Sequence, residues 1–370
     1  MARLVEVATA RLLRDLHRPF VTALRRTNQV LSIAVRLTDA DGFHGYGEAP
    51  QIWRVTGESL AGIEACVLGP LAEALLGHEF TAETAGTVQQ VLADAVAANT
   101  GARAACEVAV LDLLARRAGL SLAAFLGSTV TEVGTDITIA AQVDDPSAES
   151  VPSGFVTAKI KVGLDPADVE RVIRIQREAV EPVRIRIDAN QAWDVPTTVA
   201  NVETLQAAGV DLEFIEQPLP AWDLLGHAEL RRRLVVPVML DESVFSVHDL
   251  HRAIELGSAD LVNIKLAKCG GVHAGLEIAR QARKAELGVM VGSMMESELG
   301  VSAAAALAAV LAPTSDHDLD AAWWSINPAL DAETPYRNGR FELSASPGLS
   351  SASSRIEVDS LAWTSSASTG

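Results

Sequence analysis

Alternating apolar and polar residues indicate β-strands in the first 50 residues of the chain. Val30–Leu37 and Phe43–Glu48 alternate on either side of a turn at 39–42, which predicts an antiparallel sheet. A loop carrying Arg25 and Arg26 is expected between Arg18 and Asn28. From about residue 58 the apolar positions recur every three or four residues, which is typical of helices. The expected helices are Glu58–Leu68, Glu83–Ala98 and Ala102–Ala118, so residues 1–125 are predicted to form an α+β domain.

From about residue 135, short apolar runs alternate with segments of helical length. This alternation is the pattern of βα units in a parallel sheet, and eight such units suggest a TIM-type barrel over 126–321. The expected strands are Ile137–Val143, Ala158–Val162, Val183–Ile187, Leu212–Ile215, Val238–Leu240, Leu261–Ile264, Val289–Val291 and Ser315–Leu319. The helices named between them are Pro166–Ala179, Pro196–Ala207, Val247–Glu255 and Val272–Glu286. Residues 322–350 are expected to return to the first domain, and 351–370, rich in Ser, Ala and Thr, to form a weakly ordered tail.

Two lysines stand two residues apart in the strand-like segment AKIKVG. Residues two apart in a strand point to the same face, so Lys159 and Lys161 would repel each other unless an anion lay close. A solvated edge strand with two surface lysines is the simpler alternative.

Polar residues stand at the ends of successive predicted barrel strands, about 25 residues apart. Because a barrel brings the carboxyl ends of its strands to one face, these residues are expected to converge. Their order is a cation, three carboxylates and a cation: Lys161, Asp188, Glu216, Asp241 and Lys265. Three convergent carboxylates favour a divalent metal with oxygen ligands, and Mg²⁺ is the usual one. The alternative is that Asp188 and Asp241 each cap a following helix.

The two lysines of this set come from strands on opposite sides of the predicted metal. Nearby cations would lower the pKa of each lysine, which would make it usable as a base. Two bases flanking one carbon suggest the removal of an α-proton from one face and its return to the other, with the metal stabilising the enediolate between these steps.

Composition limits the partners and the location of the protein. The formal net charge is −18, which argues against nucleic acid and anionic membranes as partners. The three cysteines, Cys66, Cys106 and Cys269, show no metal-binding spacing and fit a reducing compartment. The longest apolar stretch, Val301–Ala312, is too short to span a membrane, so a cytoplasmic location is expected.

Together the motifs KIKVG, DAN, EQP, DES and NIKLAKCGG resemble the enolase superfamily, in its muconate-lactonising-enzyme subgroup. The resemblance implies a TIM-type barrel with an α+β capping domain. It implies that Lys161 and Lys265 are general bases and that Lys159 gives electrostatic support, with Lys268 as a further supporting lysine. It also implies that Asp188, Glu216 and Asp241 bind Mg²⁺.

Within this subgroup, the DLD motif near the eighth strand resembles that of dipeptide epimerases. The resemblance implies that Asp318 and Asp320 hold the α-ammonium group of a dipeptide, and two carboxylates do suit a cation. The alternative is that DLD only caps the barrel. The segment FVTALRRTNQ resembles the capping loop of L-Ala-D/L-Glu epimerases, which implies that Arg25 binds a glutamate side chain; a free surface arginine is the alternative. Further expected pocket residues are Trp53, Val55, Thr138, Ser293 and Met295, and Glu298 is a candidate for the same pocket.

The sequence therefore predicts an isomerase, a Mg²⁺-dependent dipeptide epimerase acting on a small-molecule murein fragment such as L-Ala-D/L-Glu. Alternatives in the same superfamily are an N-succinylamino acid racemase, an o-succinylbenzoate synthase or a cycloisomerase. A non-catalytic barrel that binds a metal and a ligand is a further alternative. Barrels of this type often self-associate, so a homo-oligomer is a further expectation.

Overall fold

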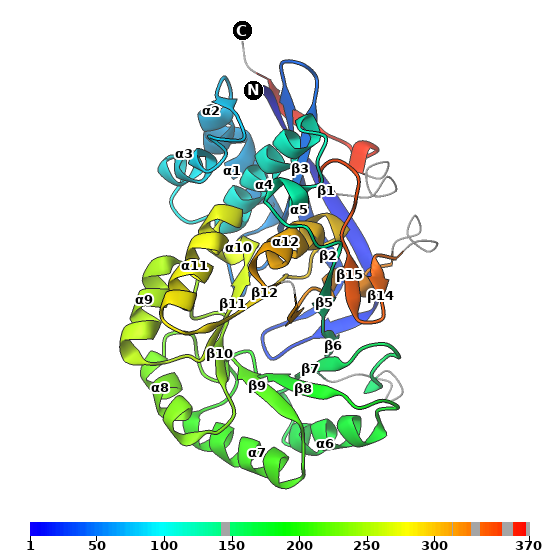
Figure 1. Cartoon of the computed structure of the whole chain (residues 1–370), viewed down its shortest axis with the longest axis vertical. Coiled ribbons are helices and arrows are strands. Elements are labelled where there is room, and N and C mark those ends of the chain that lie inside the picture. The colour runs from blue at the N-terminus through cyan, green and yellow to red at the C-terminus, as the bar shows by residue number, and fades with distance from the viewer. Residues whose placement is uncertain (142–148, 313, 327–333, 350–357, 368–370) are drawn as a thin grey trace.

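The computed structural model describes residues 1–141, 149–312, 314–326, 334–349 and 358–367. An antiparallel sheet with its helices forms a cap over one end of a barrel of parallel strands, most of which are followed by a helix (Figure 1). This arrangement confirms the predicted TIM-type barrel and α+β cap. The domain boundaries drawn from the sequence stay predictions.

The main path of the cap sheet runs in the order β16-β1-β2-β3. Strands β1 (Ala2–Val21) and β2 (Arg26–Asp39) form a long hairpin, and β3 (His44–Pro50) pairs with β2. The loop expected between Arg18 and Asn28 is shorter, because the strands continue to Val21 and from Arg26. The backbone N–H of Thr22 donates to the carbonyl of Arg25 at 2.9 Å and closes the turn. The hairpin therefore carries a short rigid tip rather than a long loop.

The cap helices pack behind this sheet. They are α1 (Leu60–Cys66), a π-helical turn η1 (Val67–Leu71), α2 (Ala72–Leu75), α3 (Thr87–Ala95), α4 (Thr100–Arg117) and α5 (Leu122–Phe125), with the two-residue strand β4 (Glu79–Phe80) between α2 and α3. Helix α4 lies so close to β3 that a Cβ atom on Gly47 would stand 2.1 Å from the carbonyl oxygen of Ala105, and one on Gly45 would stand 2.0 Å from that of Ala109. The glycines of the segment HGYGE are therefore required by this packing.

Seven parallel strands form the barrel sheet, in the order β12-β11-β10-β9-β8-β7-β6. The strands are β6 (Ile137–Ile139), β7 (Thr157–Lys161), β8 (Arg184–Asp188), β9 (Leu212–Glu216), β10 (Val238–Leu240), β11 (Leu261–Lys265) and β12 (Gly288–Gly292). The helices are α6 (Asp168–Glu178), α7 (Val195–Ala207), α8 (Leu224–Arg233), α9 (Val247–Leu256), α10 (Leu266–Cys269), α11 (Val272–Lys284) and α12 (Glu298–Leu311). The end of the expected first strand, residues 142–143, lies outside the described residues.

The eighth barrel strand is much shorter than the sequence predicts. Only β13 (Asp316–His317) forms, and it pairs with β5 (Glu132–Thr135), which directly precedes β6. A parallel bridge between Gly292 and Asp318 joins this segment to β12, and the N–H of Asp136 donates to the carbonyl of His317 at 2.8 Å. The barrel is therefore closed by a few individual bonds rather than by a full eighth strand.

After the barrel, the chain runs back along the molecule to the cap. Strands β14 (Tyr336–Arg337) and β15 (Arg340–Glu342) form a hairpin on β5, and η3 (Ala321–Trp324) is a turn of 3₁₀ helix. Strand β16 (Thr364–Ala367) pairs antiparallel with β1. This strand lies in the segment for which the sequence predicts a weakly ordered tail, and the prediction is wrong there because β1 offers β16 a sheet edge. The rest of that segment, 351–357 and 368–370, lies outside the described residues.

A buried carboxylate ties the cap to the barrel. Glu48 of β3 accepts hydrogen bonds from the Ser32 hydroxyl at 2.6 Å and from the backbone N–H groups of Ser297 and Gly300, both at 2.9 Å, and it also contacts the Ser297 hydroxyl. Ser297 and Gly300 stand at the start of α12, where unpaired N–H groups and the helix dipole favour an anion. Glu48 therefore fixes the start of a barrel helix against the cap sheet.

Replacing Glu48 with alanine is expected to lower the free energy of unfolding by about 3 kcal/mol, because several buried donors lose their charged acceptor. Urea unfolding followed by circular dichroism measures this change. Glu203→Ala, on the exposed side of α7, is the matched control and should stay within about 0.5 kcal/mol of wild type. Equal stability of the two variants would contradict this role of Glu48.

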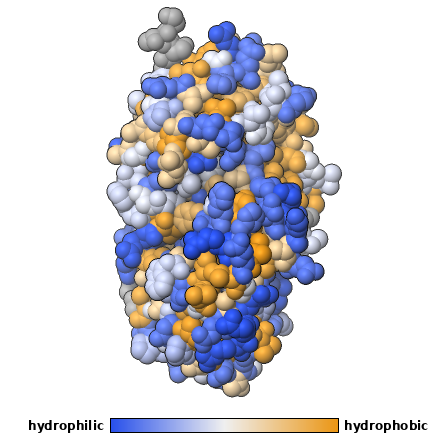
Figure 2. Space-filling view, turned by 90° about the vertical axis from the view of Figure 1, so that its left-hand side faces the viewer, coloured by the Kyte–Doolittle hydropathy of each residue, from blue (hydrophilic) through white to orange (hydrophobic). Residues whose placement is uncertain are grey.

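The helix-covered side of the molecule carries hydrophilic and hydrophobic residues side by side (Figure 2). Large exposed apolar side chains near α8 include Trp222, Leu225 and Val235. Among the described residues, none of the helices combines the length and the apolar character that crossing a membrane requires. The oligomeric state stays a prediction.

Candidate active site

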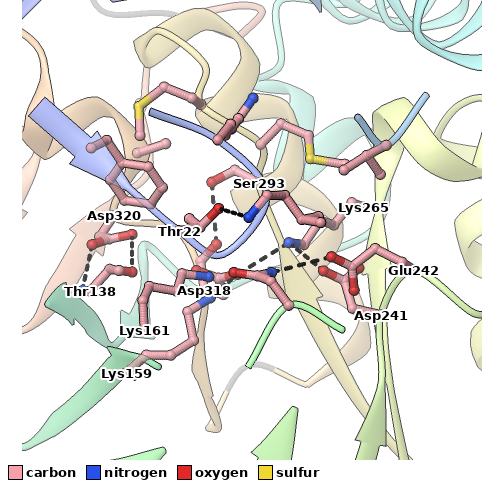
Figure 3. Close-up of a pocket in the computed structure, with 18 residues that line it drawn as sticks. Thr22, Thr138, Lys159, Lys161, Asp241, Glu242, Lys265, Ser293, Asp318 and Asp320 are labelled. Carbon is pink, nitrogen blue, oxygen red and sulfur yellow. Dashed lines mark hydrogen bonds and ion pairs between the residues drawn. The ribbon is translucent and has the colours of Figure 1, made fainter. Parts of the chain in front are cut away.

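The hairpin tip of the cap and the carboxyl ends of the barrel strands enclose one pocket. The backbone N–H of Ala141, just after β6, donates to the carbonyl of Val21 and anchors the tip there. The pocket is lined by Phe20, Thr22, Leu24, Arg25, Val55, Thr138, Lys159, Lys161, Asn190, Asp241, Glu242, Lys265, Ser293, Met294, Met295, Asp318, Asp320 and Ala321 (Figure 3).

The two lysines of KIKVG both point into the barrel. Strand β7 lies between β6 and β8, and Lys159 and Lys161 are buried, so the edge-strand alternative is wrong. The Nζ of Lys161 lies 2.5 Å from Oδ2 of Asp188 on the neighbouring strand. The Nζ of Lys159 pairs with Asp318 and lies 3.7 Å from Oε2 of Glu216. Burial acts to lower the pKa of Lys159, but Asp318 and Glu216 outweigh it and raise that pKa well above its usual value.

Lys265 enters the pocket from β11, on the other side of the barrel sheet. Its Nζ lies 2.9 Å from Oδ2 of Asp241 and 3.6 Å from Oδ2 of Asp318. Burial acts to lower the pKa of Lys265, but Asp241 and Asp318 raise it above its usual value. The nearest charges to Lys265 among the described residues are therefore the carboxylates of Asp241 and Asp318. Lys268 does not line the pocket; its Nζ lies 2.6 Å from Oδ1 of Asp241 and donates to the carbonyl of Val244.

The three predicted metal ligands stand on consecutive strands of the sheet. Asp188 and Glu216 are directly paired in register on β8 and β9, and Asp241 follows β10. All three are buried. Neither aspartate caps a helix, since the caps of α7 and α9 are Asp194 and Ser246. The capping alternative is therefore wrong, and Asp188 and Asp241 both lie close enough to Glu216 to raise its pKa.

Glu216 is a buried carboxylate with one oxygen that lacks a hydrogen bond. Its Oε1 accepts a hydrogen bond from Nδ2 of Asn263 at 2.7 Å, whereas its Oε2 is buried without a hydrogen-bond partner. Burial raises the pKa of Glu216, and Lys159 acts against that rise. A buried carboxylate oxygen without a donor is costly unless a cation compensates it. These residues fit a hard divalent ion with oxygen ligands.

Glu242 and Asn190 are pocket residues that the sequence reasoning missed. Nδ2 of Asn190 lies 3.3 Å from Oδ2 of Asp188 and 3.2 Å from Oε1 of Glu242, and Oε2 of Glu242 is buried without a hydrogen-bond partner. Burial raises the pKa of Glu242 to about 8, with Asp241 adding to the rise. The sequence signal was present, because both residues belong to the motifs DAN and DES. Only one residue was taken from each strand end.

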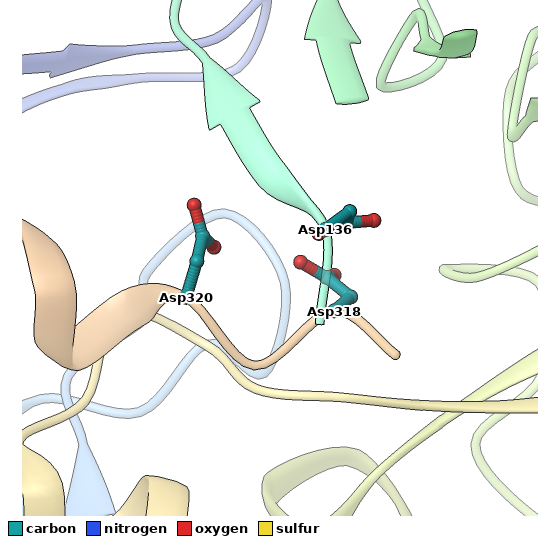
Figure 4. Close-up of side chains that lie close together, drawn as sticks. All are labelled: Asp136, Asp318 and Asp320. Carbon is teal, nitrogen blue, oxygen red and sulfur yellow. The ribbon is translucent and has the colours of Figure 1, made fainter. Parts of the chain in front are cut away.

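A second group of carboxylates gathers at the closure of the barrel. Asp318 and Asp320 follow β13, Asp136 precedes β6, and oxygen atoms of the three lie within 4.8 Å of one another (Figure 4). Such a group could bind a metal ion or an ammonium group. Arg186 already pairs with Asp136 at 2.8 Å, and Lys159 pairs with Asp318. Burial raises the pKa of Asp136 to about 8, and Lys159 acts against the rise. Asp318 does not merely cap the barrel, because it pairs with Lys159 and lies 3.6 Å from Nζ of Lys265.

The remaining predicted pocket residues divide into two groups. Arg25, Val55, Thr138, Ser293 and Met295 line the pocket, so Arg25 is not a free surface arginine. Burial lowers the pKa of Arg25 to about 10, and Glu242 acts against that change. Trp53 and Glu298 do not line the pocket: Trp53 is 63% exposed, and Glu298 is buried at the start of α12. Among the described residues, Glu298 is therefore not part of the pocket wall that contains Arg25.

Two family profiles match the chain. One, described as "Enolase C-terminal domain-like", matches residues 142–355. The other, described as "Mandelate racemase / muconate lactonizing enzyme, N-terminal domain", matches residues 4–127. The chain belongs to the enolase superfamily. The resemblance drawn from the barrel motifs is thereby confirmed.

Several relatives of this enolase-superfamily member are epimerases. The L-Ala-D/L-Glu epimerase of Bacillus subtilis is 33% identical over 353 residues, which cover 94% of this chain and 96% of that protein. The hydrophobic dipeptide epimerase of Enterococcus faecalis is 35% identical over 312 residues, which cover 82% and 86%. The solved structure of a substrate-liganded complex of the Bacillus subtilis enzyme matches with a TM-score of 0.86 at 32% identity, covering 94% of this chain and 98% of that one. A dipeptide epimerase from Enterococcus faecalis V583, complexed with Mg and L-Leu-L-Tyr, matches with a TM-score of 0.84 at 31% identity over 94% and 99% of the two chains.

Proposed function

We propose that this enolase-superfamily member is a Mg²⁺-dependent dipeptide epimerase that inverts the α-carbon of the second residue. The observation that carries the proposal is the position of two buried lysines, Lys161 on β7 and Lys265 on β11. They approach the pocket from different strands, and Asp318 and Asp320 line the same pocket. The names of the relatives support the same reaction class.

The three buried carboxylates Asp188, Glu216 and Asp241 are the proposed holders of the metal. Their donor atoms are all oxygen, and Oε2 of Glu216 lacks a hydrogen-bond donor. When bound, Mg²⁺ supplies positive charge that stabilises a substrate carboxylate as electrons move onto it. The cluster of Asp136, Asp318 and Asp320 is less suited to the metal, because Asp136 pairs with the permanently charged guanidinium of Arg186. The cations beside Asp188 and Asp241 are lysines instead.

The proposed reaction moves one proton off the α-carbon and another onto its opposite face. One lysine amine takes the α-proton, and the C–H bonding electrons pass into the substrate carboxylate to give an enediolate. The other lysine, as an ammonium, then donates a proton from Nζ to the opposite face of the same carbon, and the electrons return to form the new C–H bond. Each lysine acts as base for one epimer and as acid for the other.

Asp320 is the proposed partner of the free α-ammonium group of the dipeptide. It lines the pocket opposite Asp241 and Glu242 (Figure 3). Asp318 provides further negative charge beside it, although that carboxylate also binds Lys159. A carboxylate suits a cationic amine and repels the carboxylate of an N-succinyl group, so this end of the pocket favours dipeptides over N-succinylamino acids.

L-Ala-D/L-Glu is the proposed first substrate because Arg25 reaches the pocket from the hairpin tip. The apolar side chains of Phe20, Leu24 and Met295 line the same region, so dipeptides with an apolar second residue belong in the first panel. The substrate is a small molecule, and a cytoplasmic location stays a prediction.

The proposal is tested by solvent exchange. Incubated in D₂O with Mg²⁺, the protein is expected to replace the α-proton of the second residue of L-Ala-L-Glu, or of an apolar dipeptide, with deuterium and to form the L,D-epimer. Proton NMR measures both changes. Exchange on N-succinylamino acids instead would favour the racemase. If none of these compounds lost its α-proton signal, both activities would be ruled out. The matched control is the Lys161→Ala protein, which should not epimerise any dipeptide.

A further inference from the structure

Trp324 lies outside the predicted site but holds one of its carboxylates. Its indole Nε1 donates to Oδ2 of Asp320 at 3.0 Å. The same oxygen accepts the backbone N–H of Thr138 at 2.7 Å, and the Thr138 hydroxyl donates to Oδ1 at 3.2 Å. Two donors therefore fix Oδ2, whereas Oδ1 keeps capacity for another donor.

The indole of Trp324 is locked from several sides. Its ring is fully buried and packs edge-to-face on Phe20, with the ring centroids 5.0 Å apart. The guanidinium of Arg18 stands 4.8 Å above the ring. A buried indole N–H requires an acceptor, and its packing prevents it from turning to another one. Phe20 also lines the pocket, so the same ring contacts both the cap tip and the support of Asp320.

A second residue from the segment that follows the barrel holds the backbone between Asp318 and Asp320. The hydroxyl of Tyr336 donates to the carbonyl of Leu319 at 2.6 Å, in a buried contact from β14. The segment that follows the barrel therefore fixes both the main chain of the DLD motif and the carboxylate of Asp320.

We propose that Trp324 is a positioning residue that orients Asp320 so that Oδ1 faces the α-ammonium group of the dipeptide. Trp324 does not touch the reacting carbon and acts only through Asp320. Its effect should therefore fall on substrate binding rather than on proton transfer. This inference rests on the proposed epimerase activity.

Trp324→Phe keeps an aromatic ring for the contact with Phe20 and removes the donor to Asp320. The expected result is a rise of roughly tenfold in KM for a dipeptide, because a hydrogen bond to a charged group is lost, with kcat changed by less than about threefold. Initial rates over a range of dipeptide concentrations separate the two constants. Trp323→Phe is the matched control. Trp323 is partly exposed and packs edge-to-face on Trp324, with the ring centroids 5.8 Å apart, so phenylalanine keeps a ring there while the Trp324 donor to Asp320 stays in place. It should leave KM within about twofold of wild type.

A second measurement needs no stable variant of Trp324. In the ¹H–¹⁵N spectrum of the Mg²⁺-loaded wild-type protein, one of the six tryptophan indole signals should shift when a dipeptide saturates the pocket. That same signal should shift in Asp320→Asn, and, where Trp324→Phe folds, it should be the one that is missing.

An unchanged KM in folded Trp324→Phe, an equal rise in Trp323→Phe, or a fall in kcat alone would overturn the inference. So would a spectrum in which no indole signal responds to both the dipeptide and Asp320→Asn. A wild-type protein that exchanges no α-proton would instead count against the proposed function, so the two failures are distinguishable.

Discussion

Lys161→Ala and Lys265→Ala are each expected to abolish epimerisation while sparing α-proton exchange on only one of the two epimers. Each variant lacks the base on one face of the α-carbon, and a positioned base contributes a factor of about 10² to 10⁴ in rate. Exchange in D₂O, measured separately on L-Ala-L-Glu and L-Ala-D-Glu, should show that the two variants fail with opposite epimers.

The matched control for these variants is Lys284→Ala, which removes an exposed lysine of α11. It should exchange both epimers at the wild-type rate. Full epimerisation by either active-site variant, or loss of the same epimer in both, would contradict the two-base assignment.

Removal of divalent cations with EDTA is expected to lower the epimerisation rate by at least about 100-fold, and added Mg²⁺ should restore it. Glu216→Gln should weaken Mg²⁺ binding because it neutralises the buried carboxylate that lacks a donor at Oε2. The readout independent of activity is the melting temperature, since Mg²⁺ at about 100 times its Kd stabilises a folded protein by about 2.7 kcal/mol. In Glu216→Gln, the same Mg²⁺ concentration should no longer raise the melting temperature.

Two further variants locate the metal. Glu213→Gln changes a half-buried carboxylate at the other end of β9 and should keep the Mg²⁺-dependent rise in melting temperature. Asp136→Asn tests the second carboxylate cluster. If its rise disappeared while that of Glu216→Gln remained, the metal would belong to Asp136, Asp318 and Asp320 instead.

The convergence of the site could be predicted because the strand register of a parallel barrel is regular. Lys161, Asp188 and Glu216 stand at one level on β7, β8 and β9. Lys265 stands level with Gly292, which is bridged to Asp318. Residues that end successive strands therefore meet, and five strand-end residues were enough to indicate a metal site.

The layer of residues beneath these strand ends follows the same rule. Residues two positions earlier share the inward face, as Lys159 and Lys161 do, and Asn263 stands two positions before Lys265. Its amide binds Glu216. Arg186, two positions before Asp188, pairs with Asp136 and lies 4.9 Å from the centre of the Phe214 ring. Period-two reasoning applied to every strand would have named both residues.

Other features depend on contacts that sequence periodicity does not encode. The eighth strand is reduced to two residues because its partner is β5 rather than a full barrel neighbour. Strand β16 depends on the free edge of β1, some 360 residues earlier in the chain. The hydrogen bond from Trp324 to Asp320 requires the turn of η3 to place an indole behind a carboxylate. Each of these depends on how distant segments come together.

The pairing of β16 with β1 brings two segments some 360 residues apart in the sequence into one sheet, at the top of the molecule (Figure 1). The edge of the cap sheet is completed only once β16 has been synthesised, long after the barrel strands have been made. A linker joining the end of β16 to the start of β1, with a new opening at the exposed turn around Val180, would give a circular permutant with the same sheet order, in which the barrel is translated partly before and partly after the cap.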